Sequence, residues 1–166
     1  MSIFAKELSA QQPSKRSAIV AHPLFCSQME QINQLEKDRI FCKHNLSHLL
    51  DVCRLMQLET ITAGFSFSTD LLYGAGLLHD IGRTEGEHHL ASAKFANQIL
   101  LDCGYSQEEC SQITDAILKH RQPPTTFDDL AALLYRADKA SRPCYCCKAS
   151  TLCNWPKEKR NQQLCY

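Results

Sequence analysis

Residues 71–82 read LLYGAGLLHDIG, an apolar helical run that ends in a polar pair. Ser68-Thr69-Asp70 precedes the run as a predicted helix start, and leucines and alanines follow at helical spacing. His79 and Asp80 then occupy positions that otherwise face the core. An unpaired buried aspartate is costly, so this pair calls for a bound ion or a strong partner.

The helical pattern extends on both sides of this stretch. Further helices are predicted from Met29, from Leu46, and over residues 87–103, 106–120 and 126–141. Ser106 and Glu109 have the spacing of a capping box, and only residues 60–67 have weak strand character. We therefore predict an all-α protein, a single-domain bundle of five to seven helices.

Composition limits the function classes. The chain has 166 residues, 44% of them hydrophobic and 22% charged, which is typical of one soluble domain. Its formal net charge is zero, which argues against binding to extended nucleic acid. No apolar stretch reaches the length of a membrane span, and no signal peptide is recognised, so we expect a cytoplasmic protein without a membrane partner. The predicted parts are an N-terminal arm or tail (1–24), a helical domain (25–142) and a cysteine-rich segment packed on it (143–166).

Two more polar residues fall inside predicted helices, His48 in the second and Asp138 in the last. Together with the doublet in GLLHDIGR (76–83), they resemble the HD superfamily of metal-dependent phosphohydrolases. His88, followed by Ser92-Ala93, and His120 fit the subgroup of that superfamily that holds two metals. The resemblance covers residues from about 40 to 142.

The resemblance implies a hydrolytic metal site. The implied metal ligands are His48, His79, Asp80, His88, His120 and Asp138. Asp80 would bridge two divalent transition metals, and this donor set suits Fe, Mn, Co, Ni or Zn. The expected substrate is a small phosphorylated molecule, foremost a nucleotide, attacked by metal-activated water. Catalytic roles are predicted for Asp80, Arg83 and Lys139, and substrate contacts for His44, Arg83, Arg121, Lys139 and Arg142.

Several alternatives stay open at this stage. His89 competes with its neighbour His88 as the ligand. The superfamily also contains di-iron oxygenases, and a pocket of this kind could hold a nucleotide without turnover, as a sensor whose cysteines respond to redox state.

The ten cysteines are the remaining unusual feature. We interpret them as thiols, because no export signal accompanies them. Cys144 and Cys147 have CxxC spacing, and Cys153 adds a third thiol. Cys42 precedes His48 by six residues and Cys144 follows Asp138 by six, a rise of about 9 Å along either helix. If the two helices run antiparallel around a shared metal, Cys42 and Cys144 would lie at about the same level along them and would meet. The hypothesis is a structural zinc at Cys42, Cys144, Cys147 and Cys153, and the alternatives are unligated thiols or a protein whose main function lies in this segment.

Overall fold

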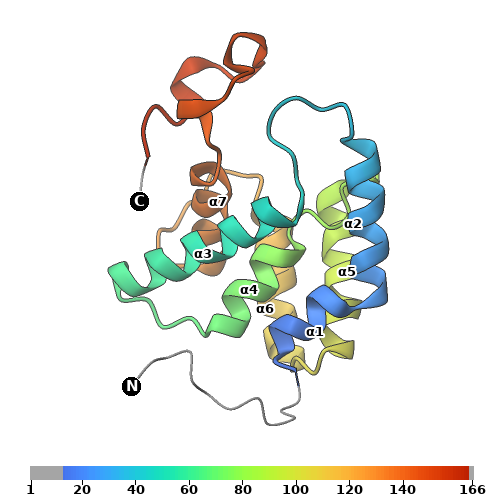
Figure 1. Ribbon diagram of the computed structural model, residues 1–166. Coiled ribbons are helices and arrows are strands. Elements are labelled where there is room, and N and C mark those ends of the chain that lie inside the picture. Colours follow the sequence, from blue (N-terminus) through green and yellow to red (C-terminus); the bar gives the residue numbers. More distant parts are fainter. Residues whose placement is uncertain (1–12, 165–166) are drawn as a thin grey trace, which may run out of the picture.

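The computed structural model describes residues 13–164 and consists of helices and loops, with no strand in that range (Figure 1). The all-α prediction is confirmed. The elements in chain order are α1 (Lys15–Ala21), α2 (Pro23–Leu35), α3 (Leu46–Ala63), α4 (Thr69–Leu78), α5 (His88–Asp102), α6 (Gln107–Lys119), α7 (Leu130–Ala140) and the 3-10 turns η1 (Cys144–Cys146), η2 (Ser150–Leu152) and η3 (Lys157–Lys159). None of the helices within 13–164 combines the length and apolarity that a membrane crossing needs.

Local capping sets several helix starts. Ser68 accepts a hydrogen bond from the Leu71 amide at 3.2 Å and begins α4, as predicted. The Ser106–Glu109 capping box is present at the start of α6. The strand character of residues 60–67 is not realised, because α3 continues to Ala63 and ends at Gly64, whose φ of 72° is the left-handed conformation of a glycine helix stop.

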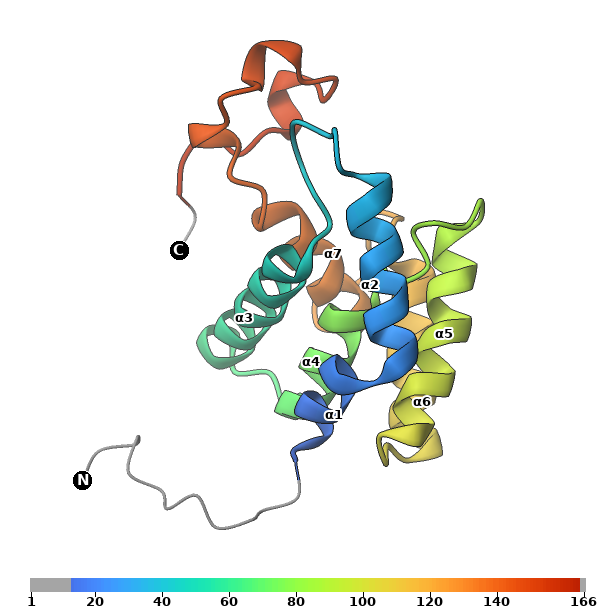
Figure 2. The same cartoon turned by 45° about the vertical axis from the view of Figure 1, so that its right-hand side comes forward.

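Helix α4 forms the centre of the bundle. It contacts α1, α3, α5, α6 and α7, and both views place α3 on one side of it and α2 with α5 on the other (Figures 1 and 2). Leu72, Leu77 and Leu78 are fully buried, and each contributes about 1.5–3 kcal/mol by that burial. Gly76 permits the close approach of α3, since a Cβ there would lie 2.5 Å from the sulfur of Cys53. The end of α4 therefore lies inside the protein.

The prediction of a loose N-terminal arm over 1–24 is wrong for its second half. Residues 15–21 form α1, which packs on α4 with Ile19 completely buried. His22 separates α1 from α2, and Pro23 occupies the first turn of α2, where its missing amide costs nothing. Prolines and short polar runs obscure the helical periodicity of this region, so the seven-residue helix was not predicted. Residues 1–12 of the predicted arm lie outside the described range.

The C-terminal segment has a different character from the bundle. Residues 141–164 contain only the three 3-10 turns, and none of their side chains is buried. The segment lies beside the loop that joins α2 to α3, beyond the end of α7 (Figure 2).

Candidate metal centre

Five helices bring the six predicted ligands to one place. His79 and Asp80 follow α4, and the other four come from surrounding elements: His48 on α3, His88 at the first position of α5, His120 directly after α6, and Asp138 on α7. His79 is completely buried, and Asp80, His120 and Asp138 are each at most 8% exposed. Burial of so many polar groups in contact favours a common partner such as a metal ion.

Asp80 lies at the centre of this cluster. Its Oδ2 is 3.6 Å from Nε2 of both His79 and His44. Its Oδ1 is 3.5 Å from Nε2 of His120 and 3.7 Å from Nε2 of His88. These separations are too long for hydrogen bonds. They are close to the roughly 3.4 Å between two atoms that each lie about 2.1 Å from a tetrahedral ion.

The donor atoms divide into groups on either side of Asp80. His48 Nε2 lies 3.6 Å from Oδ1 of Asp138. Within each group, all ligand atoms lie within 4.8 Å of one another, and the groups are His48, His79 and Asp138; Asp80, His88 and His120; and His44, His48 and Asp80. Two neighbouring ion positions that share Asp80 fit this arrangement.

Hydrogen bonds on the far side of the rings orient two of the imidazoles. His79 Nδ1 donates to the carbonyl of Gly76 at 2.8 Å, and His120 Nδ1 donates to the carbonyl of Ile117 at 2.5 Å. Because a carbonyl only accepts, each Nδ1 carries a proton, and in the neutral form of each ring the Nε2 lone pair faces the centre. Ser141 Oγ plays a similar part 3.3 Å from Nδ1 of His48.

Unpaired atoms and protonation states also fit a metal. Nε2 of His48, Nε2 of His79 and Oδ1 of Asp80 are buried without a hydrogen-bond partner. Burial, helped by the neighbouring His79, lowers the pKa of His48 to about 4, and burial lowers the pKa of His79. Burial alone would raise the pKa of Asp80, but His79 and His120 together hold it well below its usual range. At neutral pH the rings of His48 and His79 are therefore neutral and the Asp80 carboxyl is ionised, which are the metal-binding forms.

His88, rather than His89, is the histidine that the structure directs to Asp80. His89 Nδ1 instead lies 3.8 Å from Oε2 of Glu87. The turn after α4 makes this placement possible: the Gly82 amide donates to Ser92 Oγ at 2.9 Å, and a Cβ on Gly82 would lie 2.4 Å from the Ser92 nitrogen. Only glycine lets the turn lie against α5.

Glu36 is a site residue that sequence analysis missed. It is 5% exposed, and it accepts hydrogen bonds from the His44 ring at 2.7 Å, the His44 amide at 2.6 Å and Arg83 Nε at 2.7 Å. Burial opposes its ionisation, but these donors together lower its pKa to about 2. Nothing in the surrounding stretch QLEKDR distinguishes this glutamate from a solvated one. Ser141 was missed for the same reason.

The residues predicted to contact the substrate lie at different distances from the His and Asp cluster. Nη1 of Arg83 lies 3.8 Å from Asp80 Oδ2, and Lys139 donates to Oδ2 of Asp138. Arg121 is exposed and close enough to His88 to help lower its pKa, an effect that ranks after burial. Arg142 instead stacks on Trp155, 4.3 Å from the ring centre. A substrate contact by Arg142 stays a prediction.

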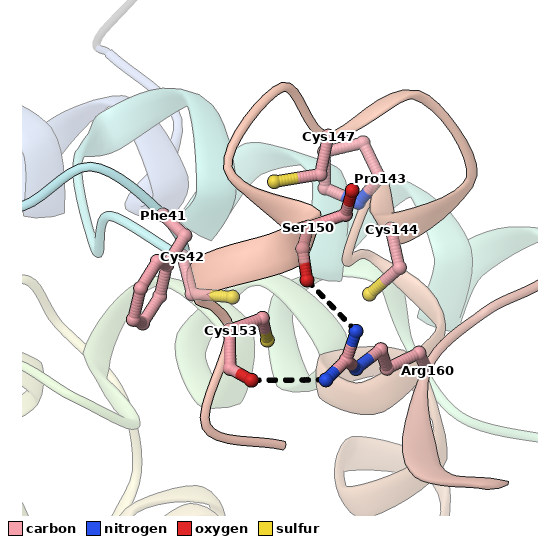
Figure 3. Close-up of a pocket in the computed structure, with 8 residues that line it drawn as sticks. All are labelled: Phe41, Cys42, Pro143, Cys144, Cys147, Ser150, Cys153 and Arg160. Atoms are coloured by element: carbon pink, nitrogen blue, oxygen red, sulfur yellow. Dashed lines mark hydrogen bonds between the residues drawn. The ribbon is translucent and has the colours of Figure 1, made fainter. Parts of the chain in front are cut away.

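The four cysteines of the structural-zinc hypothesis, Cys42, Cys144, Cys147 and Cys153, line a single cavity. Phe41, Pro143, Ser150 and Arg160 line it with them (Figure 3). Cys42 comes from the loop before α3, and Cys144, Cys147 and Cys153 come from the C-terminal segment. All four are free thiols. Burial raises the pKa of the Cys42 thiol, and the neighbouring Cys144 and Cys153 add to that effect.

An all-helical bundle that directs imidazoles and carboxylates from five helices to one buried point defines a metal-binding helical protein. The HD domain family model matches residues 45–142, more than half of the chain, which therefore belongs to the HD domain family. HD domains bind divalent metals, and hydrolases are typical of their superfamily.

One relative extends the match beyond the family region. The chain is 40% identical over 138 residues to a protein of Clostridium beijerinckii (strain ATCC 51743 / NCIMB 8052) described as uncharacterized. That similarity covers 80% of this chain and 87% of the relative. No solved structure matches the chain significantly.

Proposed function

We propose that this protein is a metal-dependent phosphohydrolase that acts on a small phosphorylated substrate, with a nucleotide as the favoured class. The observation that carries the proposal is the position of Asp80, whose two carboxylate oxygens face different groups of histidines at 3.5–3.7 Å. A shared carboxylate between two ions suits phosphoryl transfer, because neighbouring ions stabilise both the attacking and the leaving oxygen.

The proposed holders of the first ion are His48, His79, Asp80 and Asp138. Asp80 with His88 and His120 would hold the second. When bound, the ions supply an activated water at neutral pH and polarise the phosphoryl oxygens.

The protein's own cations would then orient the substrate. Arg83 is the best placed, because its guanidinium lies beside Asp80 and Glu36 fixes its Nε. A guanidinium held in this way presents its remaining N–H groups to a phosphate in a fixed direction. Lys139 holds Asp138 and is the second candidate, while the exposed Arg121 is suited to a more distant substrate group. Few cations surround the site, which favours a small phosphate over a polymer.

The test is a screen of nucleotides and simple phosphate esters with the purified protein in Mn²⁺, Co²⁺, Ni²⁺, Fe²⁺ and Zn²⁺. We expect phosphate release with at least one metal and substrate. His79→Ala and Asp138→Ala should abolish it, and His88→Ala should reduce it far more than the matched control His89→Ala.

Two outcomes would contradict this function. Hydrolysis that survives His79→Ala and Asp138→Ala would belong to a contaminant or another centre. Oxygen consumption by an iron-loaded protein without phosphate release would assign it to the oxygenases of the superfamily instead.

A further inference from the structure

The cysteine cavity lies apart from the His and Asp cluster and is formed by two distant parts of the chain. Its volume is about 40 Å³, room for only a few water-sized spheres. In Figure 3 the sulfurs of Cys42, Cys144, Cys147 and Cys153 face this common space. A space of this size excludes an organic ligand, and the four thiols that line it are donors that zinc prefers.

The C-terminal segment lacks the packing that would otherwise hold it. None of the side chains in residues 141–164 is buried, so hydrophobic burial contributes little to its position. Asn161 Nδ2 donates to the carbonyls of Lys139, Ala140 and Arg142 at 2.8–3.1 Å and ties the segment to the end of α7. Small units without a core are commonly held by a structural metal or by disulfides.

The backbone conformation of Cys42 is separate evidence that this residue has a specific role. Its φ of 49° makes it the one residue other than glycine with a positive φ in the described range. That conformation costs roughly 1–2 kcal/mol for an ordinary residue. Arg39 Nε donates to the carbonyls of Phe41 at 2.9 Å and Cys42 at 3.1 Å and helps to hold the loop in this form. Strain of this kind persists where the surroundings fix a residue for a purpose.

We propose that Cys42, Cys144, Cys147 and Cys153 bind one structural zinc ion as a tetrahedral tetrathiolate site. Cys144 and Cys147 would supply the CxxC pair, Cys153 would add a third ligand from the same segment, and Cys42 would add the fourth from the loop before α3. As each of the four zinc–sulfur bonds forms, the thiol releases its proton to solvent, and no electron is transferred.

Positive charge surrounds the cavity and suits this assignment, because four thiolates around Zn²⁺ leave two negative charges. Arg160 lines the cavity and donates to the carbonyls of Ser150 and Cys153, each at 2.9 Å. Arg39 lies beside Cys42, and Arg142 is held over Trp155 close to the same sulfur. Arg142, which the sequence assigned to substrate, thus has a role at this second site.

The zinc would stabilise the end of the bundle that carries the His and Asp cluster. It would join the loop that carries His44 to the segment that follows Asp138, and so fix the two sides of the His and Asp cluster. The proposal does not depend on the hydrolase activity, because its ligands are a different set of residues.

The test is elemental analysis of the full-length protein, purified under reducing conditions and dialysed against a weak chelator. We expect one zinc per chain that resists dialysis in the wild type and in His79→Ala. Cys144→Ser and Cys147→Ser should each lose it. Cys146→Ser is the matched control and should retain it, because Cys146 is exposed and outside the cavity.

Two measurements on the wild-type protein keep the test decisive if a variant fails to fold. Replacement of zinc by Co²⁺ should produce the intense near-ultraviolet band of thiolate-to-cobalt charge transfer. Mapping of N-ethylmaleimide adducts on the native protein should show Cys26 and Cys146 modified and the four ligands protected until the metal is removed. Disulfides among the four, iron–sulfur absorption, or zinc content unchanged in Cys144→Ser and Cys147→Ser would overturn the proposal.

Discussion

At the scale of single residues, the candidate metal centre depends on neighbours that orient the predicted ligands. Carbonyls of the preceding helical turns fix the rings of His79 and His120, and Glu36 fixes His44 and Arg83. His79 and Asp80 were predictable as a candidate site, because polar residues at the end of an apolar helix are conspicuous, and the other four ligands were predicted from the family resemblance. Glu36 and Ser141 were not, because their roles arise only from contacts that the fold creates.

Glu36 yields a prediction with a defined pH dependence. Its pKa falls from 4.5 to about 2 on folding, so it stabilises the protein above pH 4.5 and loses that contribution as the pH falls from 4.5 toward 2. Glu36→Gln should lower the unfolding free energy of the metal-free protein by about 1–3 kcal/mol near neutral pH, because the buried donors keep only a weaker acceptor.

Chemical denaturation of both proteins over a pH series measures this difference. The gap between wild type and Glu36→Gln should narrow as the pH falls below 4.5. A gap that stays constant with pH would show that Glu36 is not ionised in this network.

At the scale of helices, α4 and the turn after it organise the site. The sequence predicted α4 and its start because the apolar run and the Ser68 cap are both local features. It failed for α1, whose seven residues are too few for a periodicity to emerge and whose burial depends on α4. Helix α4 stops at Leu78, and Gly82 forms the contact between the following turn and α5.

Gly82→Ala tests that contact. The added methyl group would meet the backbone of Ala91 and Ser92 at 2.4–2.6 Å, and relief of such overlap costs about 1–3 kcal/mol. We expect a lower melting temperature and weaker binding of the ion at His88, measured by calorimetric titration of the metal-free protein. Gly86→Ala is the matched control, since no atom lies within 4 Å of a Cβ there. Equal effects of the two substitutions would contradict this role for Gly82.

At the scale of the whole molecule, the fold brings histidines and aspartates from between residues 48 and 138 to one buried point, and it gathers four cysteines around a separate cavity. The sequence predicted the first group by family resemblance and the second by counting residues along two helices, although Cys42 and Cys144 lie outside α3 and α7 in the structure. What it could not supply was the depth of burial and the division of donors around Asp80, which follow from how α3, α5, α6 and α7 pack around α4.

The most direct test of the metal centre is a crystal structure of the purified protein with anomalous scattering data collected at the absorption edges of the candidate metals. We predict two peaks on opposite sides of the Asp80 carboxylate, one among His48, His79 and Asp138 and the other between His88 and His120. Histidine and aspartate side chains that make direct hydrogen bonds to one another around Asp80, with no anomalous peak among them in metal-supplemented crystals, would contradict the account.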